Sequence, residues 1–290
     1  MVQNKKNSLN KLKNLNTDDK LIYSIIKYIT NDKFLQNKFY HSNNKYPIDD
    51  ILKSIIYILK NGVSYRNVYK YNKKISWNTI YKFHCKLIKY NIIENTYNNC
   101  INKYLNELYK HTTIMYTDTT FICNKLGSEN VSFNQQIKKH KTTKISIITD
   151  DFNVPISVIT STGSVHDSVI LNNQLDILNN KFPILFNENK IILADAAYDS
   201  IPLKKKVIDL KLGKLITPKN IRNSKTSNIE INLYEKLLLK KRISIEHTIN
   251  KYKQFKRCQL RYDKNIKTFN SFIFMVSLII LIKHSGIYLI

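Results

Sequence analysis

One basic segment holds a single acid at a position where it could take part in chemistry. Residues 240–257 fit one amphipathic helix in which Glu246 is the lone carboxylate among lysines and arginines. At 3.6 residues per turn, Arg242, Glu246 and Lys253 fall within about 40° of one another and project along one stripe. A carboxylate flanked by cations suits a metal ligand beside phosphate-binding side chains. Taken alone, this helix is explained more simply by an ion pair between Arg242 and Glu246, four residues apart.

Two acids upstream change that interpretation. The segment 114–121 is β-branched and aromatic, as in a strand, yet Asp118 stands in its middle. A second short apolar run, residues 191–194, ends at Asp195. Carboxylates that converge repel one another unless cations neutralise them, and hard oxygen ligands suit Mg²⁺ or Mn²⁺. We therefore predict that Asp118, Asp195 and Glu246 are metal-binding catalytic acids.

A pair of divalent ions at such a site would favour phosphoryl transfer. Two ions roughly 4 Å apart can activate an attacking oxygen and stabilise a leaving oxygen in an in-line displacement. Cations nearby would hold phosphates or stabilise charge in the transition state. The basic run 138–144, KKHKTTK, lies close in sequence to the strand that carries Asp118. The predicted phosphate- or DNA-binding residues are Arg242, Lys253, Lys144, Lys141 and Arg66.

The elements that must position these acids are predicted from the alternation of patterns after residue 110. Three antiparallel strands are followed by a helix, a strand, a helix, a strand and a closing helix. This order indicates an α/β (α+β) fold, an RNase H-like mixed five-stranded sheet with flanking helices. In such a sheet the first and fourth strands are neighbours, so Asp118 and Asp195 would approach each other and the closing helix would bring Glu246. The strands are expected at 114–121, 144–149, 154–160, 191–194 and 214–217.

A small helical module is predicted upstream of the sheet, over residues 46–105. Three short helices with tight turns and basic exposed faces resemble a helix-turn-helix and suit DNA binding. A helical bundle that does not touch DNA would give much the same pattern. Trp77 is expected to anchor the core of this module. Residues 1–45 are rich in Lys and Asn and are expected to form a basic, partly mobile arm, leaving 110–290 as the catalytic domain.

The charge of the chain points to a polyanionic partner. Its 290 residues contain 47 Lys and Arg against 21 acids, a net charge of +26. Such a charge favours nucleic acid through the release of phosphate counterions, and a membrane surface is the weaker rival. The amino terminus lacks an apolar signal segment, and the apolar run 272–282 is too short to span a bilayer, so we expect an intracellular protein with a buried carboxy-terminal helix.

Several strings together resemble the DDE transposases of bacterial insertion sequences, in the group with a Y-x2-R-x3-E-x6-K signature, and their eukaryotic Harbinger relatives. Arg242, Glu246 and Lys253 match the last three signature positions, whereas Leu239 replaces the tyrosine. The resemblance extends from about residue 46 to the end of the chain. It is carried further by TDTTF around Asp118, LADAAYDS around Asp195, HDS at 166–168, RYDK at 261–264 and NGVSYRNV at 61–68.

The resemblance implies a DNA transposase. Such an enzyme cleaves DNA strands at transposon ends, and the freed 3′-hydroxyl then attacks target DNA in the same magnesium site. Double-stranded DNA would be the partner, a homodimer would bring two ends together, and no membrane would be involved. The protein would act where the DNA is: the bacterial cytoplasm and nucleoid, or the nucleus or a viral factory in a eukaryotic host. A domesticated nuclease that cuts without joining, and a non-catalytic DNA-binding regulator or relic, remain alternatives.

Overall fold

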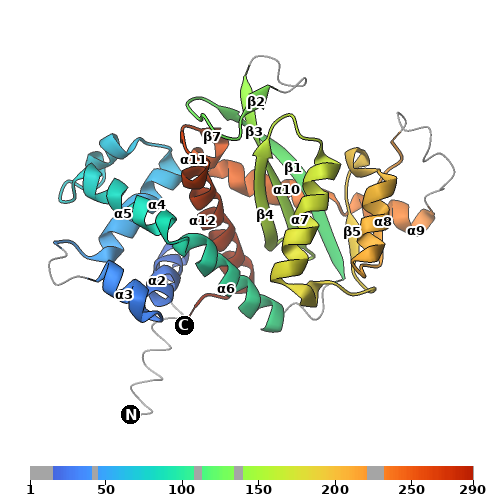
Figure 1. Ribbon diagram of the computed structural model, residues 1–290, viewed down its shortest axis with the longest axis horizontal. Helices are drawn as coiled ribbons and strands as arrows, with labels where there is room; N and C mark the ends of the chain where they lie inside the picture. Colours follow the sequence, from blue (N-terminus) through green and yellow to red (C-terminus); the bar gives the residue numbers. More distant parts are fainter. Residues whose placement is uncertain (1–15, 41–44, 108–112, 134–139, 221–231, 290) are drawn as a thin grey trace, which may run out of the picture.

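A single mixed β-sheet forms the centre of the carboxy-terminal half of the chain (Figure 1). The computed structural model describes residues 16–40, 45–107, 113–133, 140–220 and 232–289. Five strands follow one another across the sheet in the order β4-β3-β1-β5-β6, and the short strands β2 and β7 pair with β3 and β1. The bounds are β1 Ile114–Asn124, β2 Ser132–Phe133, β3 Lys141–Asp150, β4 Pro155–Thr162, β5 Ile191–Leu193, β6 Lys214–Ile216 and β7 Leu260–Arg261.

Pairing directions follow the lengths of the connections. A short turn joins β3 to β4, and those two strands and β1 are antiparallel. β5 and β6 run parallel to β1, and each is reached through a helical crossover, as parallel pairing requires. The predicted five-stranded order, with the first and fourth strands adjacent, is confirmed, and β2 and β7 extend it to seven strands.

Helices cover both faces of the sheet. α7 (Asp167–Lys181) and α8 (Ile201–Asp209) lie side by side over one face, and α10 (Ile243–Gln254) packs against β1 on the other (Figure 1). In the described residues the connections also contain the short 3₁₀ turns η1 Tyr65–Lys70, η3 Pro183–Leu185 and η4 Ala196–Tyr198. This layering gives β3 a buried environment on both sides, and nine of its ten residues are buried.

The closing helix of the catalytic part is broken, which corrects the prediction of one helix over 240–257. α9 (Leu233–Lys240) ends before Arg242, α10 ends at Gln254, and α11 (Lys256–Gln259) follows at once. Arg242 occupies the N-cap position of α10 in αR geometry, so the helical period of the sequence continues through the break and hides it.

The amino-terminal half is helical: α2 Thr17–Thr30, α3 Lys33–Phe39, α4 Ile48–Asn61, α5 Trp77–Lys89 and α6 Ile92–Glu107. Within the segment 1–45, expected as a partly mobile arm, residues 17–30 and 33–39 are helical. Leu21, Ile25 and Ile29 recur at helical spacing on α2 and are fully buried, so this segment belongs to the core. Residues 1–15 lie outside the described part of the chain.

The carboxy-terminal helix α12 (Ile266–Ser285) joins the two halves. It packs against α2, α5 and α6 on one side and against β4 on the other (Figure 1). Within the described residues it is the one helix long and apolar enough to cross a membrane, yet 67% of its most apolar window is buried inside the protein. The prediction of a buried terminal helix is confirmed, and its apolar sequence is explained by contacts on all sides.

Candidate active site

Asp118, in the middle of β1, and Asp195, just after the end of β5, lie at matching positions of two neighbouring parallel strands. Tyr116 of β1 is paired with Leu193 of β5, and each aspartate follows two residues later. A backbone N–H holds each carboxylate: Thr119 N donates to Asp118 Oδ1 at 2.7 Å, and Ala197 N donates to Asp195 Oδ1 at 2.7 Å. The strand pairing therefore brings the two aspartates together, as the predicted strand order implied.

Burial sets the electrostatics of this pair. Desolvation raises the pKa of Asp118 from 3.8 to about 6, opposed by the Thr119 N–H and the Arg242 guanidinium. The neighbouring carboxylates of Asp195 and Asp167 raise that pKa further. Repulsion among clustered acids favours a bound cation, whereas the Arg242 guanidinium already supplies part of that positive charge.

Glu246 does not join the two aspartates in this structure. Its side chain is 56% exposed, and Arg242 Nη2 lies 3.7 Å from its Oε1. Among the residues that the structure describes, no three acids, histidines or cysteines lie close enough to hold a metal ion together. The Arg242 guanidinium contacts Glu246 and is also close enough to Asp118 to lower the pKa of that carboxylate.

The stripe predicted on the closing helix is nevertheless present in part. Lys253 is exposed, as Glu246 is, and both belong to α10. Arg242 is mostly enclosed, and its Nη1 atom is buried without a hydrogen-bond partner in the described structure. A buried guanidinium nitrogen of this kind is costly unless an anion approaches it.

Lys144 corrects a predicted DNA contact. It is only 4% exposed, and its Nζ donates to Val165 O and to Asp167 Oδ1, each at 2.7 Å. Lys144 pairs with Phe121 in the ladder between β3 and β1, and its ammonium lies 4.9 Å from the Phe121 ring centroid. A lysine enclosed in this way cannot bind external phosphate without breaking its ion pair.

Lys141 and Arg66 remain accessible. Lys141 begins β3 at the surface, with Nζ 5.7 Å from the centroid of the Phe133 ring. Arg66 lies over the Trp77 ring at 5.5 Å on the surface of the helical part. Trp77 is 39% exposed, so the expectation that it anchors the core is wrong.

Two residues near the aspartates were not recognised in the sequence. Asp167 is the first residue of α7, and the exposed His166 occupies the N-cap position of that helix. Tyr198, buried behind Asp195, interacts electrostatically with Asp118, Asp167 and Asp195, and burial raises its pKa well above 10.0. Asp167 belongs to the string HDS, and Tyr198 belongs to the string LADAAYDS. Their spacing in the sequence does not show that the two residues lie near the same aspartates.

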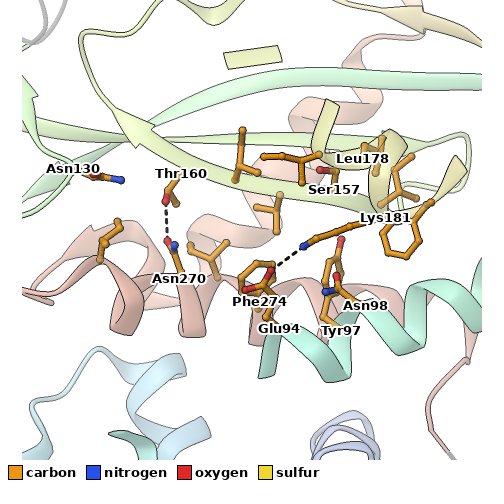
Figure 2. Close-up of a pocket in the computed structure, with 17 residues that line it drawn as sticks. Glu94, Tyr97, Asn98, Asn130, Ser157, Thr160, Leu178, Lys181, Asn270 and Phe274 are labelled. Carbon is orange, nitrogen blue, oxygen red and sulfur yellow. Dashed lines mark hydrogen bonds and ion pairs between the residues drawn. The ribbon is translucent and has the colours of Figure 1, made fainter. Parts of the chain in front are cut away.

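A separate pocket of about 310 Å³ lies at the opposite edge of the sheet (Figure 2). It is lined by α6, β4, α7 and α12, with the Lys181–Glu94 ion pair at 2.9 Å and the Thr160–Asn270 hydrogen bond at 2.8 Å. None of the predicted site residues lines this pocket. It is therefore not part of the acid site on β1 and β5.

The donor set at the aspartate pair fits hard divalent cations. Each carboxylate uses Oδ1 to accept a backbone hydrogen bond, and the described residues provide no donor to either Oδ2 atom. Carboxylate oxygens are the ligands that Mg²⁺ and Mn²⁺ prefer. Asp118 and Asp195 provide such oxygens next to each other, and Glu246 lies on the nearby helix α10.

An RNase H-like sheet with paired aspartates on adjacent strands defines a class of enzymes that process polynucleotides by phosphoryl transfer. Residues 112–281 match the family model described as the transposase DDE domain, and the chain belongs to that family. Membership confirms the function predicted from the sequence, DNA transposition by strand cleavage and strand transfer. A search of curated protein sequences gave no significant match.

One solved transposase structure shares the fold, and others align more weakly. A piggyBac transposase synaptic complex with hairpin DNA aligns with a TM-score of 0.51 at 10% identity, covering 92% of this chain and 72% of the other. A pre-cleavage Mos1 transpososome aligns at 0.29 and 9% identity, covering 91% and 96%. The Mos1 catalytic domain aligns at 0.27 and 13% identity, covering 68% and 95%. At such low identity the piggyBac alignment supports the fold.

Proposed function

We propose that this chain is a DDE transposase of the group with the Y-R-E-K signature, and that Asp118, Asp195 and Glu246 are its catalytic, metal-binding acids. The observation that carries the proposal is the position of Asp118 and Asp195 on paired parallel strands with Arg242 beside them. Mg²⁺ or Mn²⁺, as two ions, would supply the charge that activates the attacking oxygen and stabilises the leaving oxygen.

The residues of the chain divide the remaining work. Thr119 N and Ala197 N orient the two aspartates. Glu246 would complete the ligand set when its weak 3.7 Å contact with Arg242 is released, which would also free the guanidinium to bind a phosphate. Lys253, exposed on the same helix, would bind a phosphate further along the DNA.

We assign DNA binding to the helical part over residues 46–105 and catalysis to residues 110–290. The exposed Arg66 and Lys141 support contacts with double-stranded DNA on both parts. Two transposon ends must be held together for transposition, so we propose a homodimer in the synaptic complex. The piggyBac transposase structure that shares the fold is a synaptic complex with hairpin DNA. The protein would act inside the cell, wherever the DNA of its host lies.

The test of this proposal is Mg²⁺-dependent cleavage of DNA that carries the ends of the element. Glu246→Gln removes the charge with little change in shape, and we expect cleavage to fall by about 10³-fold while DNA binding is retained. Glu94→Gln is the matched control, because Glu94 is also an exposed, ion-paired glutamate but lies at the distant pocket. Equal cleavage by wild type and Glu246→Gln would refute the assignment.

A DNA-binding relic is the second candidate. Two observations favour it: Leu239 stands where the signature has tyrosine, and Glu246 points into solvent in an ion pair with Arg242. Binding without cleavage in the wild type, at any concentration of Mg²⁺ or Mn²⁺, would establish this alternative. A domesticated nuclease would instead cleave but give no strand-transfer product.

Arg66→Ala should weaken binding to the DNA ends by several-fold. If Arg66 contacts one phosphate, the slope of log K against log salt should also become shallower by about one unit. Binding measured by fluorescence anisotropy over a salt series checks both effects. Lys181→Ala changes the net charge equally but acts at the pocket in Figure 2, so an identical slope change in both variants would mean that Arg66 makes no specific contact.

A further inference from the structure

We propose that Lys144, Asp167 and Thr119 form a chain of positioning residues that fixes the carboxylate of Asp118 for metal binding. The three residues come from β3, α7 and β1, and none of them touches the pocket of Figure 2. The inference rests on the proposed metal site. It assigns a role to the HDS string and to Lys144, which is enclosed in the protein rather than exposed for DNA binding. It makes the orientation of Asp118 depend on the partly buried ion pair between Lys144 and Asp167.

The chain begins at a fixed charge. The Lys144 side chain is 5% exposed, and a buried ammonium is stable only where anions and carbonyls replace its water. Asp167 Oδ1 and Val165 O do this at 2.7 Å each, and the Phe121 ring covers the remaining side. Because these partners belong to different elements, they hold the ammonium in one position.

Asp167 passes this constraint to β1. Its Oδ1 accepts from Lys144 and also from the hydroxyl of Thr119, at 2.9 Å. A carboxylate that accepts two donors on one oxygen has little freedom to rotate, and its charge strengthens both hydrogen bonds. Asp167 lies near enough to Asp118 to raise the pKa of that residue, but Lys144 neutralises it.

Thr119 completes the connection to the metal-binding carboxylate. Its hydroxyl is held by Asp167, and its backbone N–H donates to Asp118 Oδ1 at 2.7 Å. Holding the side chain of Thr119 therefore also holds the peptide group that orients Asp118. Outer groups that orient a metal ligand are worth about 10- to 100-fold in metal affinity or activity. For Asp195, the corresponding donor is the local Ala197 N–H.

Thr119→Val tests the proposal most directly, because valine keeps the shape and the backbone N–H but removes the hydroxyl. We expect the affinity for Mn²⁺, measured by calorimetry with MnCl₂ and the free protein, to fall about 10-fold or more. The metal concentration that half-saturates cleavage should rise by the same factor. Thr119→Ser keeps the hydroxyl and should restore both quantities to within about 2-fold.

The control is Thr160→Val, which removes a hydroxyl that donates to Asn270 at 2.8 Å on the far edge of the same sheet. It should leave the affinity for Mn²⁺ unchanged. This control distinguishes a general effect of removing a hydroxyl from a β-strand from the specific loss of the hydrogen bond that positions Asp118. In an Asp167→Asn background, Thr119→Val should cost much less than in the wild type, because the two residues act in one chain. A thermal melt confirms that each variant is folded.

The outcomes separate the inference from the proposed function. If Asp118→Asn abolishes metal binding while Thr119→Val equals wild type, the positioning chain is overturned and the metal site stands. If Asp118→Asn itself binds Mn²⁺ and cleaves normally, the metal site and the chain built on it both fail. Loss in Thr119→Val, recovery in Thr119→Ser and no effect in Thr160→Val support the proposal.

Discussion

Asp118→Asn should abolish metal-dependent cleavage and at the same time make the metal-free protein more stable. An amide is a poor ligand for Mg²⁺, and losing several kcal/mol of charge stabilisation in the transition state lowers the rate about 10³-fold. DNA binding should persist, because Asp118 is largely enclosed and repels phosphate rather than attracting it. Cleavage assays and binding measured on the same DNA check both statements.

The gain in stability follows from the sign of the pKa shift. Burial raises the pKa of Asp118 from 3.8 to about 6 in the folded protein, so ionisation costs folding free energy above that value. A shift of this size corresponds to about 3 kcal/mol at neutral pH, since each pKa unit is about 1.36 kcal/mol. The cost is absent below the unfolded pKa of 3.8 and is complete above about pH 6. Asp118→Asn should therefore gain about 1–3 kcal/mol at pH 7.5 and nothing below about pH 4.

Asp150 provides the control for this argument. Burial also raises its pKa to about 6, but its carboxylate accepts hydrogen bonds from Tyr104, Phe152 N and Val154 N. Asp150→Asn should not stabilise the protein, because the amide nitrogen cannot accept the bond from the Tyr104 hydroxyl. If urea unfolding at pH 7.5 gave Asp118→Asn no gain over wild type, the ionised carboxylate of Asp118 would not destabilise the folded protein.

The sequence predicted the sheet and the aspartate pair because both depend on strong local patterns. The runs that contain Asp118 and precede Asp195 are β-branched or apolar and are separated by crossovers long enough for parallel pairing. Once the strand order follows, the adjacency of the two acids follows with it. The burial of α12 was predictable for a similar reason, because an apolar run too short to span a bilayer is expected to pack inside the protein.

Other features depended on tertiary contacts that no periodicity encodes. Lys144 belongs to a basic run and reads as a DNA contact, but β3 is buried on both faces and Asp167 offers its ammonium a partner. The break at Arg242 was hidden because the residue keeps αR geometry at the end of α9. The helical period placed Glu246 on the same stripe of α10 as Lys253. Its distance from the aspartates depends on how α10 packs against the sheet, and the sequence of the helix alone does not determine that packing.

Asp263→Asn should cause the largest loss of stability among single substitutions outside the acid site. Asp263 Oδ1 accepts from Arg257 Nη2 at 2.9 Å, and the two side chains are 3% and 7% exposed. Removing the charge of one partner leaves a buried guanidinium uncompensated, which costs about 3–5 kcal/mol. Urea unfolding followed by circular dichroism measures the loss, and Glu94→Gln, in an ion pair on the surface, should cost less than about 1 kcal/mol.

The position of this ion pair makes its loss more than a local defect. Arg257 also donates to Val63 O at 3.5 Å. A Cβ added to Gly62 would lie 2.8 Å from Lys256 Cβ, so the two segments pack closely. Arg257 thus links the string NGVSYRNV, which contains Val63, to the string RYDK, which contains Asp263, although about 200 residues separate them. Arg261, in the second string, pairs with Asn124 of β1, the strand that carries Asp118. Replacing both charges, as Arg257→Met with Asp263→Leu, should recover most of the stability because no buried charge is left unpaired. A double variant as unstable as Asp263→Asn would instead show that the helical part and the sheet are joined here by the specific ion pair and not by the packing around it.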